Sequence, residues 1–146
     1  MANCSTYGFA GSNVPLPDLV ATGTALNCFL SGFTQAADTL SAQVYANATG
    51  TGSPTLLATI TGGGSPAMKA MSTASFQIQS GTSYYAVVTD SSNGQTPQVL
   101  YNYDTLSYGT TSYAGAVTLA VEDTPNGGDC DFNDALISIT WTLYQS

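Results

Sequence analysis

Apolar and polar residues alternate with a period of two along much of the chain, which is the pattern of half-buried β-strands. Residues 75–79, 117–121 and 137–143 each place an apolar or aromatic series on one side and mostly small polar or Ala residues on the other. Similar runs predict further strands at residues 43–46, 55–60, 84–89 and 99–103. Clusters of Gly, Ser, Asn and Pro separate the strands. Short strands with turns at this spacing predict an all-β fold, an antiparallel β-sandwich.

Two segments depart from this pattern. Residues 34–43 show a weak helical periodicity, which predicts a single helical turn. Residues 1–30 are rich in Gly, Asn and Pro and predict an irregular N-terminal lead-in with room for an edge strand. The Gly/Ser-rich stretches are too short to join separate domains, and 146 residues suffice for one core. We therefore expect residues 1–146 to form a single domain.

Charged side chains are scarce: they make up 7% of the residues, against about a quarter in a typical protein. The net charge is −8, and Lys69 is the only cationic side chain. This charge argues against binding to nucleic acid or to an anionic membrane surface through phosphate contacts. The sequence has no run of 18 apolar residues, so we expect no membrane insertion. A neutral polar surface is common in secreted and cell-surface β-proteins. The first residues lack the pattern of a Sec signal, so the cytoplasm stays an alternative.

The chain has three cysteines, Cys4, Cys28 and Cys130, and an odd number cannot pair completely within one chain. A Cys4–Cys28 disulfide and two free buried thiols are both open at this stage. Cys130 lies between two aspartates, whose charge favours the protonated thiol. We expect Cys130 to be inert.

Five of the nine acidic residues lie between Glu122 and Asp134. Like charges at this density repel each other unless a cation lies among them, and the chain has no arginine or histidine. Asp129, Asp131 and Asn133 alternate along the loop, and Asp134 adjoins them, so that several oxygen atoms can converge on one point. Calcium takes six to eight such ligands. We expect a calcium site, with Gly127 and Gly128 supplying positive φ angles.

Other readings of the acidic loop fit less well. An EF-hand has Gly at its sixth position and Glu at its twelfth, where this chain has Asp134 and Thr140. Magnesium prefers few carboxylates, and zinc prefers His and Cys. A metal-free, solvated acidic turn is the remaining alternative.

The sequence also resembles a known family at two places. The run from Glu122-Asp123 through Asp129-Cys130-Asp131-Phe132-Asn133-Asp134, followed by an apolar strand that contains Trp141, resembles the C-terminal calcium loop of the bacterial fucose-binding lectin II family. Upstream, residues 45–51 resemble the family's aromatic-Ala-Asn-x-x-Gly segment, at a separation from Glu122 close to that in the family.

This resemblance implies a β-sandwich lectin in which the hydroxyls of a fucose- or mannose-type sugar coordinate calcium. It implies the metal ligands Glu122, Asp129, Asp131, Asn133, Asp134 and Asn47. Asp123 would accept a hydrogen bond from the sugar, and Ala48, Thr49 and Gly50 would tune the choice of sugar. In the family, the terminal carboxylate completes the site of a neighbouring subunit, which implies a homo-oligomer. This chain has Tyr144 at that place, so the resemblance does not decide whether the site holds one calcium ion or two.

The sequence bears on two further classes of function. In a structural or adhesive β-domain, calcium would only lock the loop, and protein oxygens would close its coordination shell. An enzyme is disfavoured, because the chain has no histidine and no evident nucleophile–base pair. We expect a calcium-dependent carbohydrate-binding protein without catalytic activity, and a structural calcium domain is the alternative.

Overall fold

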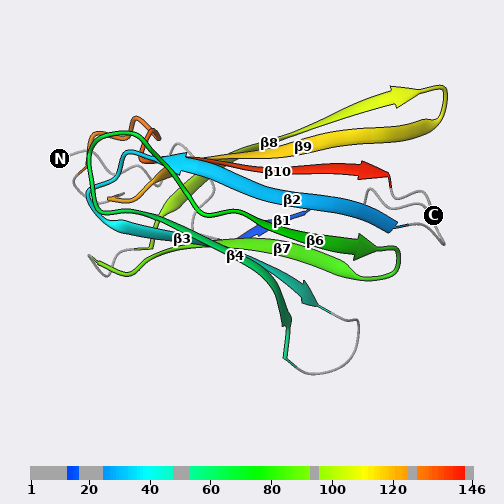
Figure 1. The fold of residues 1–146 in the computed structure, drawn as a ribbon, viewed down its shortest axis with the longest axis horizontal. Helices are drawn as coiled ribbons and strands as arrows, with labels where there is room; N and C mark the ends of the chain where they lie inside the picture. Colours follow the sequence, from blue (N-terminus) through cyan, green and yellow to red (C-terminus); the bar gives the residue numbers. More distant parts are fainter. Residues whose placement is uncertain (1–12, 17–24, 48–52, 93–95, 125–127, 144–146) are drawn as a thin grey trace.

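Two antiparallel sheets form the fold in the computed structural model (Figure 1), which describes residues 13–16, 25–47, 53–92, 96–124 and 128–143. The strands are β1 (Asn13–Pro15), β2 (Ala25–Thr34), β3 (Thr39–Asn47), β4 (Thr55–Gly63), β5 (Lys69–Ala70), β6 (Ala74–Gln79), β7 (Ser83–Asp90), β8 (Gln98–Tyr108), β9 (Thr111–Glu122) and β10 (Ala135–Leu143). The described residues include no helix, and none therefore that is long and apolar enough to cross a membrane.

One sheet has the order β1-β7-β3-β4, and the other has the order β5-β2-β10-β9-β8 with β6 also paired to β2. The core lies between them. Along β10, Ala135, Ile137, Ile139 and Trp141 are at most 3% exposed, and Leu40 and Val44 of β3 are fully buried on the opposing sheet. Period-two alternation thus places one face of each strand in the core, and the predicted antiparallel β-sandwich is confirmed.

The N-terminal region is more regular than predicted. β1 pairs with β7 at the edge of the smaller sheet, which agrees with the edge strand that the sequence allowed in this region. β2, in contrast, lies inside the larger sheet, between β10 on one side and β5 and β6 on the other. The predicted boundary at residue 30 is wrong, because Phe29 and Phe33 lie on the outer face of β2 and obscure its alternation. The helical turn predicted for residues 34–43 is also wrong. Residues 39–43 belong to β3, where Leu40 and Ala42 face the core.

Three chain segments meet at one end of the sandwich. The first residue of β10, Ala135, pairs with Thr34 at the end of β2 and with Val121 near the end of β9. The β9–β10 and β2–β3 connections therefore lie side by side at this end. The last residue of β7, Asp90, pairs with Leu40 near the start of β3 and joins them there. The last residue of β3, Asn47, lies at the opposite end of the sheet, where it pairs with Ser83 (Figure 1).

The structure decides between the two alternatives for Cys28 and corrects the expectation for Cys130. Cys28 is a free thiol in the core, where burial raises its pKa to about 12. Cys130 is disulfide-bonded and is therefore not the inert thiol that the sequence predicted. The Cys4–Cys28 disulfide is excluded because Cys28 is free, and Cys4 itself lies outside the described residues.

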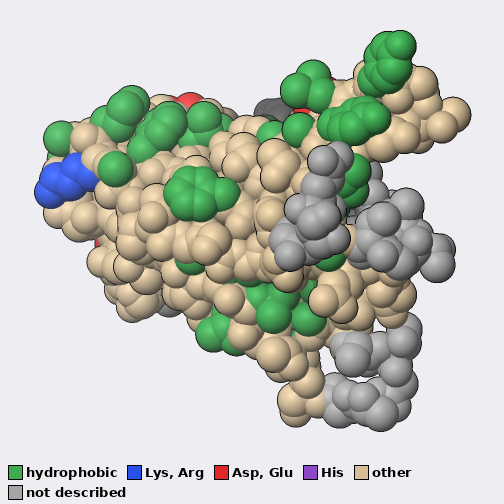
Figure 2. Space-filling model, turned by 45° about the vertical axis from the view of Figure 1, so that its right-hand side comes forward, with side chains coloured by type: hydrophobic (Ala, Val, Ile, Leu, Met, Phe, Trp, Pro, Cys, Tyr) green, Lys and Arg blue, Asp and Glu red, His purple; other side chains and the backbone are tan. Residues whose placement is uncertain are grey.

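The β8–β9 hairpin projects beyond the rest of the sandwich. Its exposed apolar and aromatic side chains include Leu106, Tyr108 and Tyr113, and hydrophobic side chains gather there in Figure 2. On the face drawn in Figure 2, Lys69 is the only blue side chain and few acidic side chains are visible. The carboxylates are instead concentrated at the end of the sandwich that carries the β9–β10 connection.

Candidate metal centre

Glu122 is the centre of the acidic loop. Its carboxylate groups with those of Asp129 and Asp131, with one oxygen atom from each residue lying within 4.8 Å of the other two. It also groups with Asp123 and Asp134 under the same distance limit. Asn133 adjoins the first group, because its side-chain amide donates to a carboxylate oxygen of Asp131. The structure thus brings together the predicted acidic loop residues.

Two residues of the acidic loop have a left-handed backbone conformation, which is rare for residues other than Gly. Cys130 and Phe132 have φ angles of 60° and 55° and alternate with the oxygen-bearing residues of the loop. A left-handed conformation costs a residue other than Gly roughly 1 kcal/mol or more. Such strain persists where the surrounding structure over-determines it, and it is frequent at ligand-binding sites.

Gly128 has a different role from the one predicted. The φ angle of Gly128 is not positive, and Gly127 lies outside the described residues. A Cβ atom at position 128 would lie 2.5 Å from Glu122 Oε1 and 2.5 Å from the carbonyl oxygen of Thr124. Glycine is required there because the backbone passes directly over the carboxylate.

A Gly128→Ala substitution should therefore displace the Glu122 carboxylate or the loop itself. We expect at least a tenfold loss of calcium affinity, with a smaller loss of stability in chelator, measured by calorimetric titration and thermal unfolding. Gly81→Ala is the control for a glycine replacement away from the loop. An added Cβ at position 81 meets no atom within 4 Å, so calcium affinity should not change, and the strain of alanine at a φ of 80° should lower stability equally in calcium and in chelator. Unchanged calcium affinity in Gly128→Ala would contradict the tight packing against Glu122.

Burial dominates the electrostatics of Glu122, which is 1% exposed. Burial raises the pKa of its carboxyl. The Thr124 N–H, which donates to Oε1 at 3.3 Å, lowers this pKa, as does the Phe132 N–H, and the nearby charges of Asp129 and Asp123 raise it further. Its second oxygen, Oε2, is buried and accepts no hydrogen bond in the part of the chain that the structure describes. A carboxylate in this position needs a proton or a cation.

Asp134 is perturbed in the same direction. Burial raises the pKa of its carboxyl to about 7; the Asp123 N–H, which donates to Oδ2 at 2.9 Å, opposes the rise, and the charges of Asp123, Glu122 and Asp131 add to it. Lys69 pairs opposite Thr34 at this end of the sheet but forms no ion pair with any described residue. The site therefore combines hard oxygen ligands, excess negative charge and an unpaired buried oxygen, which fits a divalent cation.

Asn47 does not lie at this site. It pairs with Ser83 at the far end of β3, eight residues beyond Thr39, a separation of about 26 Å at the rise of a β-strand. Its assignment as a ligand beside the acidic loop is thus wrong, because a short sequence match does not show which end of a strand a loop occupies. The residues that would tune the choice of sugar, 48–50, lie outside the described residues.

The β2–β3 connection lies where the Asn47 segment was expected. The Gln35 N–H donates to the carbonyl oxygen of Asp134 at 2.9 Å, which holds the two connections together. At the end of this connection, a carboxylate oxygen of Asp38 lies within 4.8 Å of one of Asp123.

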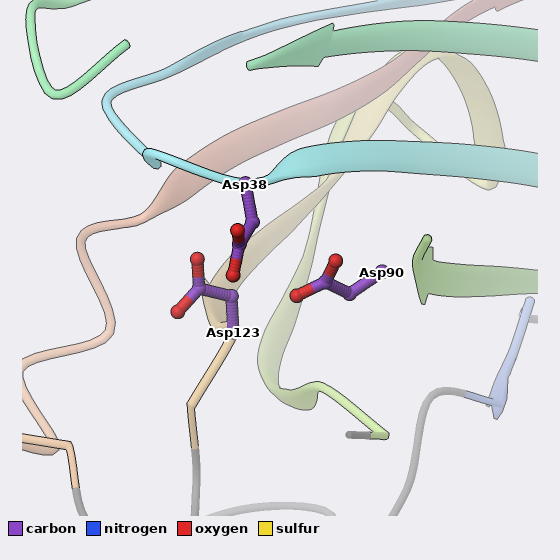
Figure 3. Close-up of side chains that lie close together, drawn as sticks. All are labelled: Asp38, Asp90 and Asp123. Atoms are coloured by element: carbon purple, nitrogen blue, oxygen red, sulfur yellow. The ribbon is translucent and has the colours of Figure 1, made fainter. Parts of the chain in front are cut away.

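Asp38 and Asp90 are site residues that sequence reasoning missed. Their carboxylates point toward that of Asp123 (Figure 3), with one oxygen atom of each residue within 4.8 Å of the other two. Asp90 is held by the Ser92 N–H, which donates to Oδ1 at 2.7 Å. Both are isolated aspartates far from the loop in sequence. Their only sequence signal is their position beside predicted strands in a chain that otherwise avoids charge.

The chain is similar in fold to solved lectin structures. The C-terminal domain of the BC2L-C lectin from Burkholderia cenocepacia superposes with a TM-score of 0.61 at 18% identity, covering 92% of this chain and 98% of that one. The Ralstonia solanacearum high-affinity mannose-binding lectin gives 0.61 at 22% identity, covering 93% and 100%. No curated protein sequence matches the chain.

The family comparison covers more than the two short sequence matches. The pattern of the fucose-binding lectin II (PA-IIL) family matches residues 20–143, which includes every strand from β2 to β10. The match begins within the segment that the sequence assigned to an irregular lead-in. Lectins are carbohydrate-binding proteins without catalytic activity. By this match and its fold, the chain belongs to the fucose-binding lectin II (PA-IIL) family.

Proposed function

We propose that this protein binds carbohydrate through calcium held in its acidic loop, with sugar hydroxyls completing the coordination of the ion. The observation that carries the proposal is the position of Glu122. This buried carboxylate lies within 4.8 Å of two groups of acidic side chains and has one oxygen without a donor in the described structure. A bound cation would satisfy that oxygen and neutralise both groups.

The proposed ligands are carboxylate and amide oxygens of the loop. The two groups that share Glu122 support two adjacent ion positions, one toward Asp129 and Asp131 and one toward Asp123 and Asp134. Calcium suits them because it accepts many oxygens in irregular geometry. When bound, it supplies the positive charge that attracts hydroxyl oxygens.

An open side is needed for a sugar to reach the ion. Asp129, Asp131 and Asn133 are exposed, whereas Glu122 is buried, so the loop presents its oxygens between the core and solvent. Asp123 accepts a hydrogen bond from the Thr124 hydroxyl at 2.7 Å, which orients its carboxylate to accept another from a sugar. We propose that the β2–β3 connection, residues 35–38, forms the adjoining wall of the sugar site.

The proposed ligand is a neutral monosaccharide of the fucose or mannose type. Two adjacent hydroxyls on such a sugar can replace two waters of calcium and gain charge-assisted contacts. An acidic sugar would face the net charge of −8 and find Lys69 as the only cationic side chain. The family name and the mannose-binding relative support the choice of neutral sugars.

Calorimetric titration with a panel of neutral monosaccharides, in calcium and in chelator, tests the function. We expect binding of fucose or mannose in calcium and its loss in chelator. Binding that persists in chelator would contradict the proposal. If calcium raises the midpoint of thermal unfolding but no sugar binds, the alternative of a structural calcium domain is favoured, which the deep burial of Glu122 would also suit.

Localisation and assembly complete the proposal. The disulfide at Cys130 favours an oxidising compartment, so we propose a secreted or cell-surface protein. We also propose a homo-oligomer. Phe29, Leu100 and Leu136 are 46%, 38% and 36% exposed on the outer face of the larger sheet, where a second copy can cover them. Sedimentation analysis checks the assembly state.

A further inference from the structure

Gln98, the first residue of β8, carries a buried oxygen atom that lacks a hydrogen bond. The side chain is 6% exposed, and its Oε1 accepts no hydrogen bond within the described ranges. An unpaired buried acceptor costs about 1–3 kcal/mol, so native proteins retain few of them without a bound water, ion or ligand. Nothing in the acidic motif of residues 122–134 points to this residue.

Gln98 stands directly opposite Glu122 in the β8–β9 ladder. Residues in such a pair project from the same face of the sheet, with Cβ atoms roughly 4.5–5.5 Å apart. Glu122 Oε2 is likewise buried and without a donor among the described residues. A buried acceptor needs a donor or a cation, and the described residues supply no donor to either Glu122 Oε2 or Gln98 Oε1. The pair therefore points to a shared cation.

The acidic loop covers the same face of the sheet as Gln98 and Glu122. Gly128 packs against Glu122 Oε1, and Asp129 and Asp131 follow it along the loop. Thr34 also has a buried hydroxyl oxygen without a partner in the described structure, but it belongs to the row of Ala135 and Val121, whose side chains face the core. Among the described residues, Gln98 and Glu122 thus carry the unpaired buried oxygens on the loop side of this sheet.

We propose that the Gln98 side-chain oxygen is a further ligand of the calcium ion held by Glu122, Asp129 and Asp131. The inference rests on the proposed function, since it assigns one more ligand to the same metal centre. Amide oxygens are common calcium ligands, and a neutral one adds coordination without adding repulsion to a site that already holds several carboxylates. Gln98 would tie the start of β8 to the acidic loop.

The test is a Gln98→Leu variant titrated with calcium alone. We expect calcium affinity to fall about tenfold or more. In chelator, the variant should unfold at the same temperature as the wild type or a higher one, because leucine removes an unpaired buried oxygen. Calcium should then raise its unfolding temperature less than that of the wild type. A purely structural glutamine would instead lower stability equally in both conditions.

Asn102→Leu is the matched control, since Asn102 is exposed on the same face of β8, four residues along, and should leave calcium affinity unchanged. Gln98→Glu is the second variant. It keeps an oxygen at the position and should bind calcium at least as tightly as the wild type, while lowering stability in chelator.

The outcomes separate the two claims. A wild-type protein that binds no calcium overturns both the proposed function and the role of Gln98. Calcium binding by the wild type together with unchanged affinity in Gln98→Leu overturns the role of Gln98 alone. Should Gln98→Leu fail to fold, the glutamate variant decides, and weaker calcium binding by Gln98→Glu than by the wild type overturns the inference.

Discussion

Asp131→Ala is expected to abolish calcium-dependent sugar binding and to remove most of the thermal stabilisation by calcium. Asp131 lies with Glu122 and Asp129 in one of the two groups that share Glu122, and its exposed side chain makes no contribution to the core. A ligand present at a thousand times its dissociation constant stabilises a fold by about 4 kcal/mol. Losing a coordinating carboxylate removes most of that gain, whereas the calcium-free protein loses only the local hydrogen bonds to Asn133.

Thermal unfolding in calcium and in chelator measures this effect, and calorimetric titration with fucose or mannose measures sugar binding. Asp104→Ala is the control, because Asp104 is an exposed aspartate on the outer face of β8, six ladder steps from the pair that Gln98 and Glu122 form. It should change neither calcium nor sugar binding. Equal destabilisation by Asp131→Ala in both buffers would mean that the loop does not hold a metal ion.

The calcium-free protein is expected to lose stability as the pH rises from about 4 to about 7. The pKa of Asp134 is raised from 3.8 to about 7 in the folded protein, chiefly by burial, and that of Glu122 is raised as well. The folded state therefore binds protons that the unfolded state has already released in this range. Each carboxyl that ionises opposes folding, and the loss is complete above the folded pKa.

Calcium should reverse this trend. Because the ion competes with protons for the carboxylates, its affinity should increase with pH up to about 7, and binding should release protons. The measurements are thermal midpoints across this pH range in chelator and in calcium, together with calorimetry in buffers of different ionisation enthalpy. Asp134→Asn should flatten the pH dependence in chelator. A midpoint that rises with pH in chelator would contradict the raised pKa values.

The strands were predictable because their signal is local. Ile137, Ile139 and Trp141 face one side of β10 in the sequence pattern and in the fold alike, since alternate residues of any strand face opposite ways. β2 escaped prediction because Phe29 and Phe33 are apolar on its outer face. Whether an apolar residue faces the core or the outside depends on which sheet covers it, and that is a property of the assembled sandwich.

The acidic loop was predictable for a similar reason. Glu122, Asp129 and Asp131 are close in sequence, and a chain with one cation leaves them no internal counter-charge, so their convergence on a metal ion follows from composition and spacing. The left-handed φ of Cys130 and the close packing of Gly128 against Glu122 were seen only in the structure.

By itself, the sequence determined the sandwich, the acidic loop and the family, because each depends on residues that are neighbours along the chain. Only the tertiary structure decided what surrounds the loop. It placed Asn47 at the far end of β3, brought Asp38 and Asp90 to Asp123, and set Gln98 opposite Glu122. These contacts depend on strand order and register, which are set by the packing of whole sheets. They therefore cannot be read from the few residues that they bring together.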